Sequence, residues 1–327
     1  MTTGAHELWR PSSGCDDDCL PVVGEVPTVP VARRVLRLVA ATGMLVAGVG
    51  LVLLLPVLPT RERQAAVRGW ARATTRSFGV RLVIRGRLPR RRALLVANHV
   101  SWLDILAVLA VAPTRMVAKR EIRSWPVVGL LAAAAGTVFV DRSRPRALPT
   151  SVGQVAEMLR AGRSVAVFPE GTTWCAGDGA ADCRPGGGFR PAMFQAAIDA
   201  GSPVVPLRLA YRCEAIGSTT TATAFLGADT LLRSVARVVA ARDIVVSVTI
   251  AAALHPARAA DRRLLARAAE SAVHLLPAGG VTRTRLRPVP TVTTAVRVPA
   301  LAAANPHPPP GGNTKQDPRN FGEVAAS

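Results

Sequence analysis

An uncharged apolar stretch runs from Leu38 to Pro59, and it limits the possible folds more than any other segment. A helix of about 20 apolar residues crosses the roughly 30 Å hydrocarbon core of a bilayer. The stretch is too long, and starts too far into the chain, for an ordinary cleaved signal peptide. Its glycines and Pro56 also allow a kinked, re-entrant or interfacial segment, and a buried helix of a soluble domain is the third alternative. We predict a transmembrane helix or an embedded segment over residues 35–60.

The segment that follows is strongly basic. Eleven arginines and a single acid, Glu62, lie between Arg61 and Arg92. Bases beside an apolar span mark its cytoplasmic side, and each gains about 1 kcal/mol from anionic lipid. The alternative is a solvated basic face that says nothing about orientation. Because the bases come directly after the apolar stretch, we expect a cell-membrane protein whose main domain faces the cytoplasm.

The whole chain is also basic, with 41 Lys and Arg against 21 Asp and Glu and a net charge of +20. Nucleic acid, an anionic membrane surface and anionic substrates are the partners that such a charge attracts. Proteins that bind single-stranded nucleic acid commonly stack its bases on aromatic side chains, yet only 4% of these residues are aromatic. We predict an anionic membrane surface as a partner, and no nucleic acid.

From about residue 80, short β-rich runs alternate with helical stretches. Such alternation predicts an α/β domain with a mainly parallel sheet flanked by helices. We expect a polar, disordered N-terminal segment (1–34), the apolar segment (35–60), the α/β domain (61–280) and a disordered Pro/Ala-rich tail (281–327). The expected strands are 82–84, 93–97, 116–118, 137–140, 164–168, 204–209 and 244–250, and the expected helices are 103–111, 125–135, 151–160, 192–200 and 261–276.

One of the five histidines, His99, has a setting that suits catalysis. It follows the apolar run 93–97 and opens the helix that contains Asp104, and ligands of α/β proteins bind at the carboxyl ends of strands. On a regular helix, two side chains five residues apart point about 140° away from each other. If His99 lies just before the first turn, however, its ring can donate one N–H to the Asp104 carboxylate. The other ring nitrogen is then free to take a proton, which predicts His99 as a general base and Asp104 as the group that orients it.

A structural role explains the same residues. Ser101 and Asp104 have the spacing of a capping box, in which Asp104 begins the helix and His99 is incidental. The two roles are compatible if the cap sets the start of the helix just after His99.

Two further segments end apolar strands with groups that suit an anionic ligand. In the run 168–172, Gly171 lets backbone N–H groups approach an anion closely and Thr172 adds a hydroxyl, while the Glu170 carboxylate could accept hydrogen bonds from a polyol or hold the neighbouring loop. The run from Gly136 ends in Arg142, whose guanidinium can bind two phosphate oxygens at once. For the run 168–172 the alternative is an ordinary turn after a strand, with Pro and Gly as common turn residues. For Arg142 the alternative is an arginine on the surface with no ligand.

Together these segments resemble the motifs of the lysophospholipid acyltransferase family, the glycerolipid acyltransferases. Asn98 to Asp104 resembles its H-x4-D motif, and the three later motifs follow in the family's order within residues 85–211. The later matches are Gly136 to Arg142, Phe168 to Thr172 (F-P-E-G-T) and Pro203 to Leu207, and the run Lys119-Arg120-Glu121 with Pro126 and Gly129 is similar to the family's K-x-E-L…P-x-x-G stretch.

The resemblance implies a membrane-bound O-acyltransferase with a glycerolipid acyltransferase-like fold. His99 would deprotonate an acceptor hydroxyl that attacks the thioester of acyl-CoA or acyl carrier protein, with no acyl-enzyme and no cofactor. Gly136, Arg142, Glu170, Gly171 and Thr172 would hold the acceptor, and Pro206 would shape the acyl site. The expected reaction converts 1-acylglycerol-3-phosphate to phosphatidic acid. The alternatives are another lysolipid, such as a lyso-ornithine lipid, a lysocardiolipin or a glycolipid, and a catalytically silent lipid-binding membrane protein.

The chain departs from the family pattern after Thr172. A Trp174-Cys175 pair and a Gly-rich insertion follow, and Arg190 stands in place of the commoner lysine of F-K-x-G, which leaves the acceptor head group open. The odd number of cysteines does not form a disulfide framework. Cys15 with Cys19, or Cys175 with Cys183, could hold a metal, but neither pair has the double C-x-x-C spacing of a zinc site. We therefore predict no metal and ordinary thiols, as in a reducing compartment.

Overall fold

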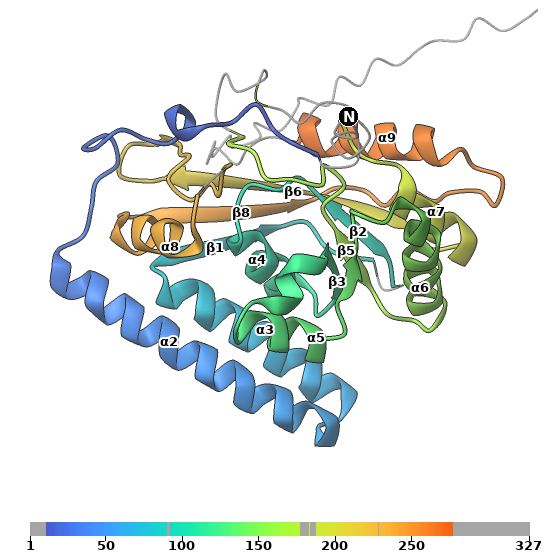
Figure 1. The fold of residues 1–327 in the computed structure, drawn as a ribbon, viewed down its shortest axis with the longest axis horizontal. Coiled ribbons are helices and arrows are strands. Elements are labelled where there is room, and N and C mark those ends of the chain that lie inside the picture. Colours follow the sequence, from blue (N-terminus) through green and yellow to red (C-terminus); the bar gives the residue numbers. More distant parts are fainter. Residues whose placement is uncertain (1–10, 90–91, 177–182, 184–187, 228, 277–327) are drawn as a thin grey trace, which may run out of the picture. The chain divides into compact units, whose positions relative to one another are not determined.

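A computed structural model describes residues 11–89, 92–176, 183, 188–227 and 229–276, and eight strands within these residues form one sheet (Figure 1). The strand order is β1-β8-β6-β2-β5-β3-β4, with the short β7 paired to β6. All pairs are parallel except those of β6 with β7 and β8. The strands are β1 Val80–Arg85, β2 Leu94–Ala97, β3 Arg115–Lys119, β4 Val138–Val140, β5 Val165–Val167, β6 Val204–Cys213, β7 Ser218–Thr219 and β8 Ile244–Ile250.

Helices cover both faces of this sheet. The α-helices are α2 Val31–Leu54, α3 Thr60–Ser77, α4 Leu103–Val111, α5 Val128–Ala134, α6 Leu148–Arg160, α7 Ala192–Ala200, α8 Leu231–Ala240 and α9 Arg262–Leu275. Helices α3, α4 and α8 lie on one face, with α2 outside α3, and helices α6, α7 and α9 lie on the other (Figure 1). The predicted mainly parallel sheet flanked by helices is confirmed.

The central strands are buried on both sides, which explains why they read as continuous apolar runs. Alternate residues of β2 point to opposite faces. Leu95 and Ala97 pack in the core with α4 and α8, whereas Leu94 and Val96 pack in the core with α6, α7 and α9. Strand β2 lies between β5 and β6, so the residues that follow its carboxyl end emerge in the middle of the sheet.

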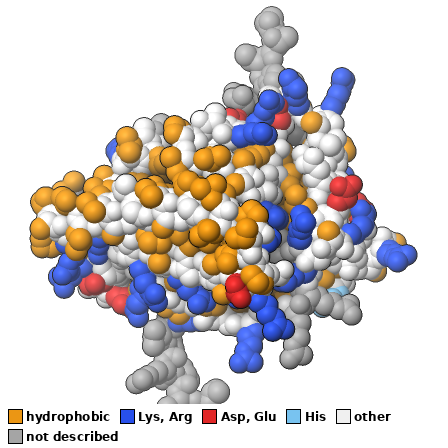
Figure 2. Space-filling model, turned by 90° about the horizontal axis from the view of Figure 1, so that it is seen from below, with side chains coloured by type: hydrophobic (Ala, Val, Ile, Leu, Met, Phe, Trp, Pro, Cys, Tyr) orange, Lys and Arg blue, Asp and Glu red, His pale blue; other side chains and the backbone are white. Residues whose placement is uncertain are grey.

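Helix α2 is the predicted apolar helix. With the turn of 3₁₀-helix that follows it, it forms a candidate membrane span over Val31–Val57. An 18-residue stretch within this span has a mean hydropathy of 2.5, and 11% of that stretch is buried. It packs along α3, where the Trp70 indole N–H donates to the carbonyl of Met44 at 2.8 Å. Figure 2 shows the outcome, a broad hydrophobic surface on the side of the molecule formed by α2, with lysine and arginine around it.

Residues 11–30 lie against the α/β domain. The Val29 N–H donates to the Ala240 carbonyl at the end of α8, at 2.9 Å, and the Arg242 N–H donates to the Pro27 carbonyl at 2.8 Å. Cys15 and Val29 are buried. The polar composition of this segment does not predict such packing, and the expected tail at 281–327 lies outside the described residues.

Candidate active site

His99 lies in the loop between β2 and α4, at the carboxyl end of the strand. Its Nδ1 atom lies 2.9 Å from Oδ2 of Asp104, a hydrogen-bonded contact. Asp104 is fully buried, whereas the His99 side chain is 20% exposed. Because His99 precedes the first helical residue, Leu103, the ring reaches Asp104 although the two residues are five apart in sequence.

Asp104 also caps the start of α4. Its Oδ2 atom accepts the backbone N–H of Val100 at 2.6 Å and that of Ser101 at 2.8 Å. This is the half of a capping box in which the acidic side chain reaches back to the preceding turn. The predicted catalytic role and the predicted cap therefore fall on the same carboxylate, and the cap fixes that carboxylate beneath the imidazole.

The second oxygen of Asp104 meets a residue that the motif does not include. The Tyr211 hydroxyl donates to Oδ1 of Asp104 at 2.5 Å from strand β6. Burial, together with the negative charge of Asp104, raises the pKa of Tyr211 well above its usual range. The phenol thus stays protonated and continues to donate to the carboxylate.

Three contacts from the loop after β5 fix His99 from the other side. The backbone N–H of His99 donates to Oε2 of Glu170 at 2.7 Å. The imidazole stacks on the Phe168 ring, with centroids 4.0 Å apart and planes at 10°. The backbone N–H of Trp174 donates to the carbonyl of His99 at 3.1 Å. Of the two roles considered for Glu170, these contacts support holding the neighbouring loop.

Gly171 provides the turn that makes this arrangement possible. Its φ of +75° is a left-handed conformation that favours glycine. Its N–H donates to the Phe168 carbonyl at 3.0 Å, so this N–H serves the turn. Thr172 lies next to it in the same partly buried loop.

A basic pair lies beside this loop. Arg142 follows β4, and burial is the main cause that lowers its pKa; the Arg190 charge lowers it further, while Glu121 raises it. The Arg190 side chain lies within van der Waals reach of Gly171, and its backbone N–H donates to the Pro169 carbonyl at 3.0 Å. Because the charge of Arg190 acts on Arg142, these two guanidinium groups can together bind an anionic head group.

The structure does not bring Gly136 or Pro206 to the imidazole. Gly136 precedes β4, whereas Arg142 follows it, so the two ends of this predicted motif lie at opposite edges of the sheet. There Gly136 ends α5 with a φ of +70°, and its N–H donates to the Ala133 carbonyl. Pro206 is buried inside β6, opposite Val96 of β2.

Sequence reasoning missed Tyr211 and Arg190. Tyr211 stands at the end of the matched motifs and is the only tyrosine of the chain. A polar hydroxyl in an apolar strand is the signal that could have identified it, since a buried hydroxyl requires a partner. Arg190 stands where the family commonly has a lysine, and either side chain supplies a cation at that position.

The contacts of His99 leave one atom of the site, Nε2, in a position to accept a proton. The Nδ1 side of His99 is occupied by Asp104, which leaves Nε2 as the nitrogen that can take a proton from a hydroxyl. A buried carboxylate with three further donors stabilises the imidazolium that results. Beside this site the sulfurs of Cys15, Cys19, Cys175 and Cys183 lie close enough to one another to hold a metal ion.

Comparison with known proteins identifies the family of this chain. A family model described as Acyltransferase matches residues 80–210. The lyso-ornithine lipid O-acyltransferase of Pseudomonas aeruginosa is 33% identical over 262 residues, which are 78% of this chain and 97% of that protein. The 1-acyl-sn-glycerol-3-phosphate acyltransferase of Neisseria gonorrhoeae is 44% identical over 118 residues, which are 36% of this chain and 44% of that protein.

A solved structure supports the fold. The crystal structure of the 1-acyl-sn-glycerophosphate acyltransferase PlsC from Thermotoga maritima superposes with a TM-score of 0.55 at 19% identity, over 74% of this chain and 92% of that chain. At this identity the likeness concerns the fold alone. With the nearly full-length relative from Pseudomonas aeruginosa, the comparisons establish that this chain belongs to the acyltransferase family.

Proposed function

We propose that this protein transfers a fatty acyl chain from a thioester donor to the hydroxyl of a membrane lysolipid, with lyso-ornithine lipid as the acceptor. The reaction type rests on one observation, the imidazole of His99 held at Nδ1 by the buried Asp104 carboxylate. The acceptor is suggested by the Pseudomonas aeruginosa relative, because the similarity extends over almost all of that protein. This proposal puts lyso-ornithine lipid ahead of the acceptor first expected from the motifs, 1-acylglycerol-3-phosphate.

A second acceptor keeps specific support. Arg190 lies beside the turn at Gly171 and its charge acts on Arg142, and guanidinium forks bind phosphate oxygens well. The same pair would also bind the carboxylate of an ornithine head group. 1-Acylglycerol-3-phosphate, the substrate named for the Neisseria gonorrhoeae relative, is therefore the second candidate.

The proposed reaction needs only one proton carrier. Nε2 of His99 takes the proton of the acceptor hydroxyl, whose oxygen attacks the thioester carbonyl carbon. The carbon–sulfur bond then breaks, and the proton on His99 passes to the departing thiolate. Asp104 holds the tautomer throughout, and Glu170 and Phe168 fix the ring and backbone of His99. Both acyl-CoA and acyl carrier protein are anionic, so the basic surface suits either donor.

The described contacts favour an embedded α2 over a simple span. Helix α3 packs along α2 and carries five arginines, of which Arg61, Arg72 and Arg76 are exposed. An arginine at the bilayer centre costs about 2.5–3.5 kcal/mol or more, so α3 cannot accompany α2 across the hydrocarbon core. We infer that α2 lies at the membrane interface, with its apolar face in the lipid and α3 toward the head groups. We further propose that α2 lies in the cytoplasmic leaflet, because the anionic lipids of that leaflet attract the arginines of α3.

An acceptor panel tests the reaction. Membranes containing the full-length protein are incubated with labelled acyl-CoA or acyl carrier protein and with lyso-ornithine lipid, 1-acylglycerol-3-phosphate or lysocardiolipin. Products are identified by mass spectrometry. The expected result is acylated ornithine lipid from the wild type and a rate at least about 100-fold lower for His99→Ala.

The exposed His255 gives a matched control, since His255→Ala removes an imidazole outside the site and should leave the rate unchanged. A wild-type rate for His99→Ala would disprove the assignment of the base. Transfer to 1-acylglycerol-3-phosphate alone would replace the acceptor and keep the reaction. No transfer to any lysolipid from either donor, by protein that remains bound to membranes, would favour the silent lipid-binding alternative.

A further inference from the structure

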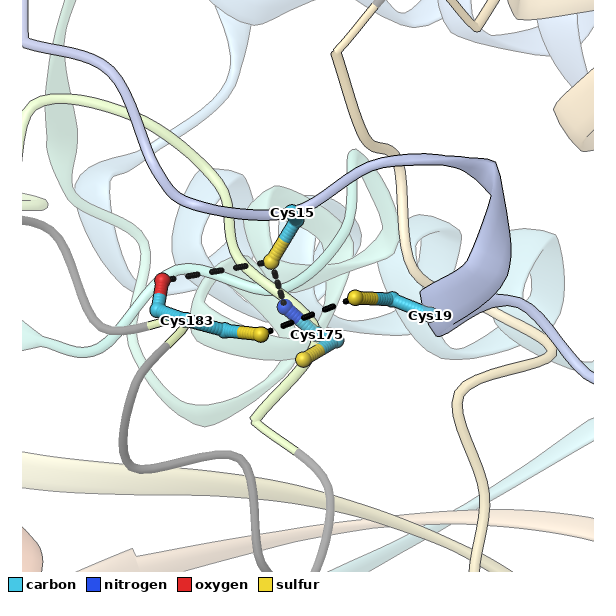
Figure 3. A group of neighbouring side chains, drawn as sticks. All are labelled: Cys15, Cys19, Cys175 and Cys183. Carbon is cyan, nitrogen blue, oxygen red and sulfur yellow. Dashed lines mark hydrogen bonds between the residues drawn. The ribbon is translucent and has the colours of Figure 1, made fainter.

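Four of the five cysteines converge on one point. Cys15 and Cys19 come from the N-terminal segment, and Cys175 and Cys183 come from the loop that follows Thr172. In Figure 3 their sulfurs point toward one another, and all four lie within 4.8 Å of one another. Cys15 and Cys175 are buried, and the other two are partly buried. About 160 residues separate the two pairs, so only the fold brings them together.

The spacing of these sulfurs fits one tetrahedral ion. With a zinc–sulfur bond of about 2.3 Å, the edge of the tetrahedron is about 3.8 Å. The Sγ atoms of Cys19 and Cys183 lie 3.6 Å apart, and the other pairs lie within the 4.8 Å limit. The separations therefore lie within about 1 Å of those in a tetrahedral zinc–thiolate site.

Other uses of the same cysteines fit the arrangement less well. Disulfides would join the four sulfurs as two separate pairs, each at about 2.0 Å, and give no reason for all four to share one centre. An iron–sulfur cluster binds its thiolates to different iron atoms, so it would hold the sulfurs farther apart than a single ion does. A site of four thiolates around one centre is typical of Zn²⁺.

The surroundings also suit thiolates bound to a cation. The backbone N–H of Cys175 donates to Sγ of Cys15 at 3.1 Å, a contact that stabilises a sulfur carrying negative charge. A divalent cation offsets the cost of burying thiolates, as it does in structural zinc sites.

We propose that Cys15, Cys19, Cys175 and Cys183 bind one Zn²⁺ ion in a closed structural site. The four thiols release four protons to solvent on binding, and the resulting centre carries a charge of about −2. Four protein ligands leave no open position for a substrate or water, so the ion takes no part in acyl transfer.

The ion connects the N-terminal segment to the wall of the active site. Trp174, next to Cys175, donates its backbone N–H to the His99 carbonyl. Pro11, at the start of the described residues, lies so close to Gly171 that a β-carbon there would meet its ring at 2.7 Å. The Zn²⁺ site thus holds the segment carrying Cys15 and Cys19 across the loop that positions His99, beside the basic pair that would select the head group.

Metal content of the purified full-length protein tests the proposal independently of acyl transfer. The protein is expressed in a medium without added zinc, purified in detergent and analysed by inductively coupled plasma and native mass spectrometry. We expect one Zn²⁺ per chain, and at least a tenfold lower zinc content in Cys19→Ser and Cys183→Ser. Cys213 is the matched control, because it is buried in β6 with its thiol directed at the Arg242 carbonyl. Cys213→Ser should keep its zinc.

Measurements on the wild type do not depend on whether the variants fold. Replacement by Co²⁺ should give the visible absorption of a tetrahedral cobalt–thiolate centre, and the four cysteines should resist alkylation until a chelator is added. Zinc-free protein with four readily alkylated thiols, or with disulfides in mass spectra of peptides, would overturn the proposal. Stoichiometric iron, or zinc retained equally by all three variants, would overturn it as well.

Discussion

At the scale of single residues, the Asp104 carboxylate links the local fold to the chemistry. It accepts hydrogen bonds from two backbone N–H groups and the Tyr211 hydroxyl, and it holds His99. Asp104→Asn keeps the shape of the side chain but turns an amide N–H₂ toward donors. We expect the rate constant of transfer to fall at least about 100-fold, with a loss of about 1–3 kcal/mol in unfolding free energy. Steady-state rates and chemical denaturation measure the two effects, and a wild-type rate would contradict the orienting role.

Tyr211→Phe isolates one of those hydrogen bonds. The change leaves Oδ1 of Asp104 without its donor at 2.5 Å, so we expect about 1–3 kcal/mol of destabilisation and a reduced rate with little change in KM. Ser247→Ala is the control, because Ser247 is also buried in the sheet and its hydroxyl donates to a backbone carbonyl instead. An equal loss of rate in both variants would reduce the role of Tyr211 to general packing.

The raised pKa of Tyr211 adds a dependence on pH. A phenol whose pKa is higher in the folded state than in the unfolded state stabilises the fold fully below the unfolded pKa, near 10. That stability is lost as the pH rises from about 10 toward the folded pKa. The wild type should therefore lose more unfolding free energy than Tyr211→Phe between pH 9 and 11. Denaturant titrations across this range measure the difference, and parallel curves for the two proteins would contradict it.

The residues of the site differ in how well the sequence predicts them. His99, Asp104 and Glu170 could be placed at one edge of the sheet, because parallel strands end together and each follows such a strand. Gly136 could not be placed at that edge from the motif alone, because the motif spans strand β4 and its two ends lie at opposite edges of the sheet. Tyr211 lies 107 residues after Asp104, and only the packed sheet brings the two together. Distant pairings of this kind leave no periodic signal.

At the scale of elements, the sequence predicts the buried strands and the helices that have clear ends. Parallel strands are apolar on both sides, so runs such as 93–97 and 244–250 stand out. Helices α3 and α8 were not predicted as elements. In α3 the arginines dominate the composition, which hides its apolar face. In α8 the apolar residues do recur at helical spacing and Thr230 caps the first turn, so the sequence carried a helix signal there. Their helical state depends on packing against α2, α4 and the sheet.

The contact between α2 and α3 depends on one small residue. A β-carbon on Gly48 would lie 2.8 Å from the Trp70 ring, whereas a β-carbon on Gly43 of the same helix meets nothing within 4 Å. Gly48→Ala should therefore force the helices apart and weaken the Trp70 bond to Met44, costing about 1–3 kcal/mol. Gly43→Ala should be neutral or stabilise α2 by up to about 1 kcal/mol, because alanine favours helix. Thermal unfolding in detergent measures the stability of both variants, and tryptophan fluorescence reports changes around Trp70. Changes in stability of equal sign in the two variants would contradict the packing of α2 on α3.

At the scale of the whole molecule, charge and apolar surface are combined on one side. The hydrophobic face of α2 has arginines beside it, and α9 covers the opposite face of the sheet (Figures 1 and 2). The sequence predicts the high positive charge, but it cannot say which arginines share a side with the apolar helix. That depends on the turn between α2 and α3, which returns the chain along α2.

Two charge-matched triple variants test whether this sidedness controls membrane binding. The first replaces the exposed Arg61, Arg72 and Arg76 of α3 by glutamine, and the second replaces the exposed Arg262, Arg263 and Arg267 of α9. Each removes three positive charges, so an effect of net charge alone would be the same in both. With about 1 kcal/mol per arginine near an anionic surface, the α3 variant should bind vesicles containing phosphatidylglycerol on the order of 100-fold more weakly. The α9 variant should bind like the wild type, and on zwitterionic vesicles all three should agree, because only the apolar face of α2 then acts. Vesicle flotation at increasing salt measures these affinities, and equal weakening of both variants would mean that net charge, rather than the orientation of α2 and α3, draws the protein to the membrane.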